Sequence, residues 1–167
     1  MMTPEIAKEK ILSLLSEVKR DGIDNLIKFV KESDYLTDAT CYSHHKDRYG
    51  LMFHSLEVLD TMLGSAAEGL ARDSIILVGL CHDLGKARKD GQHQGRGRHP
   101  QRSLYILRKC GVKLSDLERD AIGNHHPKTV KAYASAVTNP LQRLLHRGDC
   151  KSTGMDKEGS SFVFNYL

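Results

Sequence analysis

Residues 74–86 read SIILVGLCHDLGK, and their pattern is the strongest indication of the architecture. From residue 75 to residue 80 it has almost no polar face, which is typical of a helix buried in the middle of its domain. Its β-branched residues would also suit a parallel strand, but no other run in the chain resembles a partner strand, so the pattern favours a helix. His82 and Asp83 follow at once, and burying two hydrated groups costs several kcal/mol unless something compensates them. A metal ion is the natural compensation.

Helical periodicity extends in both directions from this stretch. A first helix is expected to begin at Thr3-Pro4 and to end near Asp21-Gly22. Its apolar stripe is predicted on Ile6, Ile11, Leu14, Leu15 and Val18. Further helices are expected over residues 23–31, 51–70, 100–109, 114–124 and 129–147, the last with a kink or restart at Pro140.

Residues 35–50 and 86–98 break the periodicity and are predicted to be loops, the second of them exposed, and Gly85 is expected to stop the central helix. The length of 167 residues suits one domain, so the sequence predicts an all-α, single-domain helical bundle. Residues 1–49 are expected to pack on a core formed by residues 50–150, and residues 151–167 to form a tail. The tail ends in FVFNYL, which either packs on the core or pairs with a second subunit, so a homo-oligomer stays open.

The composition narrows the class of protein. With 40% hydrophobic and 28% charged residues, it excludes a disulfide-stapled miniprotein, a collagen-like fibre and a wholly disordered chain. The four cysteines form no CxxC pair, and no signal peptide precedes them, which indicates a reducing compartment. No stretch approaches the roughly 18 apolar residues that span a bilayer, so a cytoplasmic protein without a membrane segment is expected.

The positive charge is concentrated in one segment. The net charge is +4, but residues 86–109 alone hold eight Lys or Arg against one acid, Asp90, which leaves the rest of the chain slightly acidic. A protein that coats nucleic acid usually spreads its basic groups over an extended face. The pattern therefore favours a focused anion site over general affinity for nucleic acid.

Histidines and aspartates recur near predicted helix ends or on inward faces. The residues concerned are His54, His82, Asp83, His99, His125 and Asp149. Imidazole and carboxylate groups contributed by several helices of a bundle can form a metal site. A single buried histidine is more often a hydrogen-bonded core residue than a ligand, and for His54 taken alone that alternative stays open.

The order His54, then His82-Asp83 within GLCHDLGK, then Asp149 resembles the H…HD…D signature of the HD superfamily of metal-dependent phosphohydrolases. GLMFHSLEV at residues 50–58 resembles the first histidine helix of that family, and IGNHHPK at residues 122–128 its later histidine motif. YSHHKDRYGLMFHS is also similar to the segment before the first ligand in HD domains of certain 3′ to 5′ exoribonucleases and phage-borne hydrolases. The chain departs from the family in having Gly148 before Asp149, where alanine is commoner.

This resemblance implies an all-α fold in which His54, His82, Asp83 and Asp149 hold one metal ion. In two-metal members, Asp83 would bridge to a second ion held by His99 and His125. His125 is favoured over His126 because its spacing from Ile122 matches the family pattern. For His126 the roles of third-metal ligand, general acid or supporting group stay open. His44 and His45 either line the substrate pocket or belong to an ordinary exposed loop.

The ligand types suit Mn, Fe, Co, Ni or Zn, in one or two ions, better than a site meant only for Mg, although Mg is possible. Such a site turns a bound water into a hydroxide that attacks phosphorus. Asp83 and Lys86 are the expected catalytic residues, and Lys86, Arg96 and Arg98 the expected contacts to substrate phosphate. Alternatively, each of these basic residues belongs to a solvated loop and does not contact substrate.

The leading hypothesis is a metal-dependent phosphohydrolase or phosphodiesterase acting on a nucleotide, a cyclic nucleotide or a short oligonucleotide. A di-iron oxygenase of the same superfamily and a non-catalytic nucleotide- or nucleic-acid-binding module are the alternatives. The motifs do not specify the substrate, because selectivity depends on the shape of the pocket.

Overall fold

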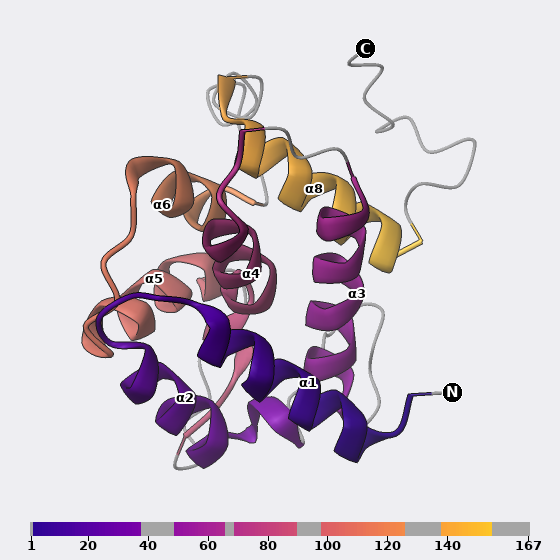
Figure 1. Ribbon diagram of the computed structural model, residues 1–167, viewed down its shortest axis with the longest axis vertical. Coiled ribbons are helices and arrows are strands. Elements are labelled where there is room, and N and C mark those ends of the chain that lie inside the picture. Colours follow the sequence, from indigo (N-terminus) through magenta and orange to yellow (C-terminus); the bar gives the residue numbers. More distant parts are fainter. Residues whose placement is uncertain (1, 38–48, 66–68, 90–97, 126–137, 155–167) are drawn as a thin grey trace.

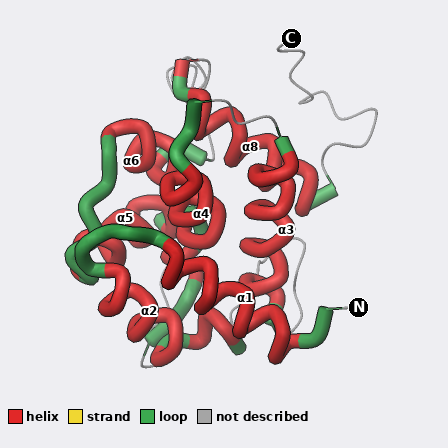
Figure 2. The backbone as a smooth tube through the Cα atoms, viewed as in Figure 1, coloured by secondary structure: helices red, strands yellow, loops and turns green. Residues whose placement is uncertain are grey.

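The computed structural model describes residues 2–37, 49–65, 69–89, 98–125 and 138–154, and within these ranges the chain forms helices and loops without a strand (Figures 1 and 2). The prediction of an all-α fold is therefore confirmed. The helices are α1 (Pro4–Glu17), α2 (Ile23–Glu32), α3 (Gly50–Gly64), α4 (Arg72–Cys81), α5 (His99–Lys109), α6 (Asp116–Gly123) and α8 (Pro140–Ser152), with short 3-10 turns η1 (Asp34–Leu36) and η2 (Leu84–Lys86).

Helix α4 lies in the middle of the bundle, as its apolar sequence predicts. Every residue from Ile75 to Cys81 is buried. In Figure 1, α3 lies on one side of α4 and α5 and α6 on the other, while α8 crosses above them. α3 packs against both α4 and α8, α5 packs against η2 and α6, and α1 covers α3 and α4. The C-terminal end of α4, where His82 and Asp83 lie, is consequently enclosed by other helices.

Gly85 does not end the central helix. α4 already ends at Cys81, with His82 as its C-cap, and Gly85 belongs to η2. A Cβ atom on Gly85 would overlap the carbonyl oxygen of His99. Glycine is needed here because the turn after Asp83 packs directly on the start of α5.

Several predicted boundaries and faces also need correction. Ile6 is 52% exposed, and Ala7 is buried in its place, because successive side chains on a helix point about 100° apart and Ala7 shares the stripe of Ile11. α3 ends at Gly64 rather than at residue 70. At Pro140 the chain restarts as a helix rather than kinking, with Asn139 as N-cap, and residues 129–137 lie outside the described ranges.

Residues 87–89, the start of the predicted exposed loop, pack against the rest of the protein. Ala87 is fully buried, and Asp34 accepts hydrogen bonds from the backbone N–H and the Nε of Arg88. Lys89 donates to Glu32 at 2.7 Å. Residues 90–97 lie outside the described ranges. None of the helices in the described ranges has both the length and the apolar character that a membrane span needs.

Candidate metal centre

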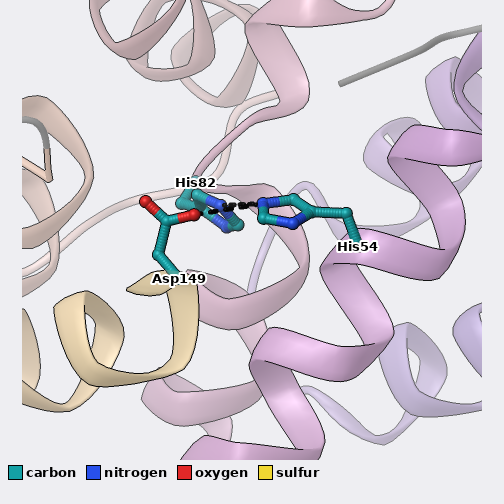
Figure 3. Close-up of side chains that lie close together, drawn as sticks. All are labelled: His54, His82 and Asp149. Carbon is teal, nitrogen blue, oxygen red and sulfur yellow. Dashed lines mark hydrogen bonds and ion pairs between the residues drawn. The ribbon is translucent and has the colours of Figure 1, made fainter. Parts of the chain in front are cut away.

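The six histidines and aspartates singled out from the sequence lie together in the structure. His54 projects from α3 and Asp149 from α8, His82 and Asp83 follow α4, His99 begins α5, and His125 follows α6. His54 Nε2 lies 3.3 Å from both His82 Nε2 and Asp149 Oδ1. Figure 3 shows these three side chains pointing toward one another, His54 from α3, Asp149 from α8 and His82 from the turn after α4.

Asp83 lies between two groups of imidazoles. Its Oδ2 atom is 3.4 Å from His54 Nε2 and 3.5 Å from His82 Nε2. Its Oδ1 atom is 3.2 Å from His99 Nε2 and 3.3 Å from His125 Nε2. Two ligand groups whose donor atoms lie within 4.8 Å of one another can be formed, namely His54 with His82 and Asp149, and His82 with Asp83 and His125.

Hydrogen bonds fix the orientation of two of the rings. His82 Nδ1 lies 2.9 Å from the carbonyl oxygen of Gly79, and His125 Nδ1 lies 2.7 Å from that of Ile122. A carbonyl oxygen only accepts, so Nδ1 donates in both rings. In the neutral ring the lone pair is then on Nε2, which faces the centre of the cluster.

The charges of the cluster call for a cation. Burial alone would raise the pKa of Asp83, but His82, Lys86 and the other imidazoles hold it well below its ordinary value. Burial would likewise raise the pKa of Asp149, but its hydrogen bond to His54 holds that pKa well below the ordinary value. Burial lowers the pKa of His82 to about 3, whereas in His54 the two aspartates outweigh burial and raise the pKa to about 10. Both carboxylates are therefore ionised at neutral pH, so a cation bound between them would be stabilised by their charge.

The donor set fits a divalent metal ion. Asp83 Oδ1 is buried and accepts no hydrogen bond of normal geometry from any described residue, although two imidazole nitrogens lie near it. Two atoms that share an ion at about 2.1 Å lie roughly 3.0 to 3.4 Å apart in octahedral and tetrahedral geometry. The separations of 3.2 to 3.5 Å found here are close to those values. Imidazole with carboxylate suits Mn, Fe, Co, Ni or Zn.

The cluster is most open at His99. The side chains of His54, His82 and His125 are fully buried, whereas those of Lys86, Asp149 and His99 are 10%, 11% and 18% exposed. Lys86 donates a hydrogen bond to Asp83 Oδ2. The structure thus places Lys86 beside the cluster, while its contact to substrate phosphate stays a prediction.

Of the other predicted site residues, the described ranges include Arg98 alone. Arg98 is exposed and immediately precedes His99. Arg96, His126, His44 and His45 lie outside the described ranges.

Sequence reasoning missed three polar residues that support the cluster. Ser103, one turn after His99, accepts from the N–H of Gly85 and donates to the carbonyl oxygen of His82 at 2.8 Å, so it holds the turn that carries Asp83. Ser152 and Glu57 are the other two, and each lies three residues after a predicted ligand. Their spacing of three or four residues from a predicted ligand could have marked each of them as a candidate, because residues so spaced share a helix face. It could not have shown which residues they contact.

The described residues form a helical bundle with a buried cluster of histidines and aspartates that could hold a metal ion. This combination is typical of helical proteins that bind metal between their helices. The family model described as HD domain matches residues 51–153, so the chain belongs to the HD domain family. Comparison with curated proteins and with solved structures gave no match.

Proposed function

We propose that this protein is a metal-dependent phosphohydrolase that cleaves a phosphate ester of a nucleotide, a cyclic nucleotide or a short oligonucleotide. The observation that carries the proposal is the position of Asp83, which turns one carboxylate oxygen toward His54 and His82 and the other toward His99 and His125. Lys86, a fixed cation, adjoins it at the open edge.

In this proposal, His54, His82, Asp83 and Asp149 would hold one ion, and His99 and His125 would hold a second one with Asp83. When bound, the metal supplies a water of lowered pKa and draws negative charge from the phosphoryl oxygens. The protein's own residues orient the reaction. Lys86 Nζ, which adjoins Asp83, would donate to a phosphoryl oxygen as negative charge develops there, and the buried imidazoles would exclude bulk water from the inner side.

The distribution of positive charge supports an anionic substrate. Three of the basic residues in the segment 86–109 pair with acids, since Lys86 binds Asp83, Arg88 binds Asp34 and Lys89 binds Glu32. The others include Arg98, just before α5, and three residues on that helix, Arg102, Arg108 and Lys109.

Among the described helices, α5 is the one without an acidic side chain. It begins at His99, on the open edge of the cluster. Basic residues thus follow His99 along a helix that has no acidic side chain, which suits a phosphate-bearing substrate.

The test is a screen for phosphate-ester hydrolysis with each metal in turn. Nucleoside monophosphates, nucleoside triphosphates, cyclic nucleotides and short RNA are incubated with the protein and Mn, Fe, Co, Ni, Zn or Mg. We expect cleavage that depends on metal, that is lost at least about 1000-fold in Asp83→Asn, and that is retained in Asp60→Asn, whose carboxylate pairs with Lys10 at the surface.

Two outcomes would replace the proposal by the alternatives. Oxygen uptake with Fe and no hydrolysis of any ester would assign the centre to a di-iron oxygenase. Nucleotide binding that is unaffected by Asp83→Asn, again without hydrolysis, would indicate a binding module.

A further inference from the structure

Helices α3 and α8 carry a second polar layer one turn beyond the proposed metal ligands. Glu57 follows His54 by three residues on α3, and Ser152 follows Asp149 by three residues on α8. Ser152 Oγ donates to Glu57 Oε2 at 2.8 Å and lies 2.9 Å from His54 Nδ1. The three side chains therefore form a chain of hydrogen bonds from the cluster to the surface, where Glu57 is exposed.

The direction of each hydrogen bond in this chain follows from the groups involved. The ionised carboxylate of Glu57 only accepts, so the single hydroxyl proton of Ser152 is directed to Glu57. Ser152 Oγ must then accept from His54, which places a proton on Nδ1. In the neutral ring the lone pair is on Nε2, the nitrogen that lies within 3.4 Å of His82, Asp83 and Asp149.

His54 differs in this respect from the two other buried histidines. His82 and His125 donate from Nδ1 to the carbonyl oxygen three residues earlier in the chain, so the backbone supplies their partner locally. The partner of His54 is a side chain on a different helix. The orientation of His54 consequently depends on α3 and α8 being in register.

We propose that Ser152 and Glu57 are positioning residues for the metal centre, which orient His54 and strengthen Nε2 as a donor. A carboxylate that polarises an imidazole through a hydroxyl raises the basicity of the far nitrogen, and partners of this kind are typically worth 10- to 100-fold in metal affinity. The inference rests on the proposed metal centre, but it concerns residues that the HD signature does not contain.

The test measures metal affinity in the metal-free full-length protein, without any substrate. Mn or Zn is titrated by calorimetry or by competition with a chelating dye. We expect Ser152→Ala to weaken binding 10- to 100-fold, Ser152→Thr to keep nearly the wild-type affinity, and Glu57→Gln to lose less than Ser152→Ala, since an amide oxygen still accepts but without the charge. Ser65→Ala is the matched control, because Ser65 Oγ donates only to the Thr61 carbonyl oxygen at the end of α3.

Thermal unfolding of each metal-free variant separates positioning from a structural role. Weaker binding in Ser152→Ala, at an unchanged melting temperature of the metal-free form, supports the inference. Wild-type affinity in Ser152→Ala, or an equal loss in Ser152→Thr, overturns the positioning role and leaves the proposed function standing. Failure of the wild-type protein to bind any of the metals overturns both.

Discussion

Gly148 immediately precedes Asp149 in α8, where a Cβ atom would lie 2.9 Å from the carbonyl oxygen of Val58 in α3. The missing side chain allows α8 to approach α3 closely. Asp149 Oδ1 thereby comes within 3.3 Å of His54 Nε2. The glycine at this position, where the resemblance to the family led us to expect alanine, therefore helps to bring two proposed ligands together.

Gly148→Ala is expected to lower the free energy of unfolding by about 1 kcal/mol. Overpacking against a helix backbone costs typically 1–3 kcal/mol, which exceeds the gain of about 1 kcal/mol in helix propensity. Urea denaturation of the metal-free protein measures the change. Gly64→Ala is the control, because a Cβ atom there would meet nothing within 4 Å and should be neutral or stabilising. A variant at position 148 that is more stable than wild type and binds metal equally well would contradict the close-approach argument.

Lys86→Gln is expected to lower kcat at least about 100-fold without weakening metal binding. The Lys86 ammonium group stabilises the charge of Asp83 in the metal-free protein, so it competes with a metal ion for that carboxylate. Metal affinity should consequently stay the same or rise when the positive charge is removed. Steady-state kinetics and a metal titration on the same preparation test both parts, and a loss of metal affinity would show that Lys86 supports the centre rather than the reaction.

For single residues, the sequence predicts the histidines and aspartates of the cluster, but not the polar side chains that contact them. His82 and Asp83 are recognisable because they directly follow a buried apolar run, where hydrated groups need compensation. Ser152 and Glu57 lie far apart in the chain and meet only because α3 packs on α8, so no local pattern marks them as partners.

Among the helices, α6 is the one that leads into the proposed ligand His125, and several contacts hold its start in place. Ser115 and Glu118 form a capping box at its start, which is why the helix begins at Asp116 rather than at Leu114. Glu118 also accepts from Arg20 at 2.6 and 2.7 Å, and Arg20 donates to Ser74 of α4. One buried carboxylate thus fastens the turn before α2, α4 and α6 together, and α6 leads into His125.

The stability of the protein should fall in acid partly through Glu118. Burial would raise the pKa of Glu118, but hydrogen bonds from Arg20, Ser74 and the Ser115 N–H outweigh it and lower the pKa to about 2. The unfolded chain has the ordinary value near 4.5, so this stabilisation is complete above pH 4.5 and is lost as the pH falls toward 2.

Chemical denaturation at a series of pH values tests this prediction against Glu118→Gln. Wild type should lose about 2 kcal/mol more than the variant between pH 5 and pH 2. The difference isolates Glu118 from Asp83 and Asp149, whose lowered pKa values act in the same direction in both proteins. Parallel curves would contradict the role of this carboxylate.

The apolar periodicity predicts that a helix forms, whereas the residue at which the helix ends depends on contacts with other parts of the fold. The apolar run fixes α4 as the central helix, but the chain turns at His82 so that Asp83 can face four imidazoles. Gly85, which locally looks like a helix stop, is required by the distant carbonyl oxygen of His99. Only the packing of η2 on α5 reveals that reason.

At the scale of the whole molecule, the proposed ligands join α3, the segment after α4, α5, the end of α6, and α8. A metal ion bound by them would link these parts directly. Binding to the folded state alone stabilises a protein by about 2.7 kcal/mol when the free ligand is at 100 times its Kd. For a chain of this size, that corresponds to a rise in Tm of roughly 5 to 10 °C.

Thermal unfolding with excess Mn or Zn and with a chelator tests this expectation. Wild type should melt higher with metal, and Asp83→Asn should show little or no rise because the carboxylate that lies near all four imidazoles is lost. Equal melting temperatures of the wild type in both conditions would contradict a metal centre that spans the bundle.

The proposed ligands are spread along the chain, so the proposed metal site is completed late in synthesis. Chains fold progressively as they emerge from the ribosome, from the N-terminal end onward. His54, His82 and Asp83 are made early, but Asp149 and Ser152 arrive with α8. If the proposed ligands and the proposed role of Ser152 hold, a nascent chain that still lacks α8 offers an incomplete ligand set and an unoriented His54, and stable uptake of metal then follows only after α8 has been synthesised and docked.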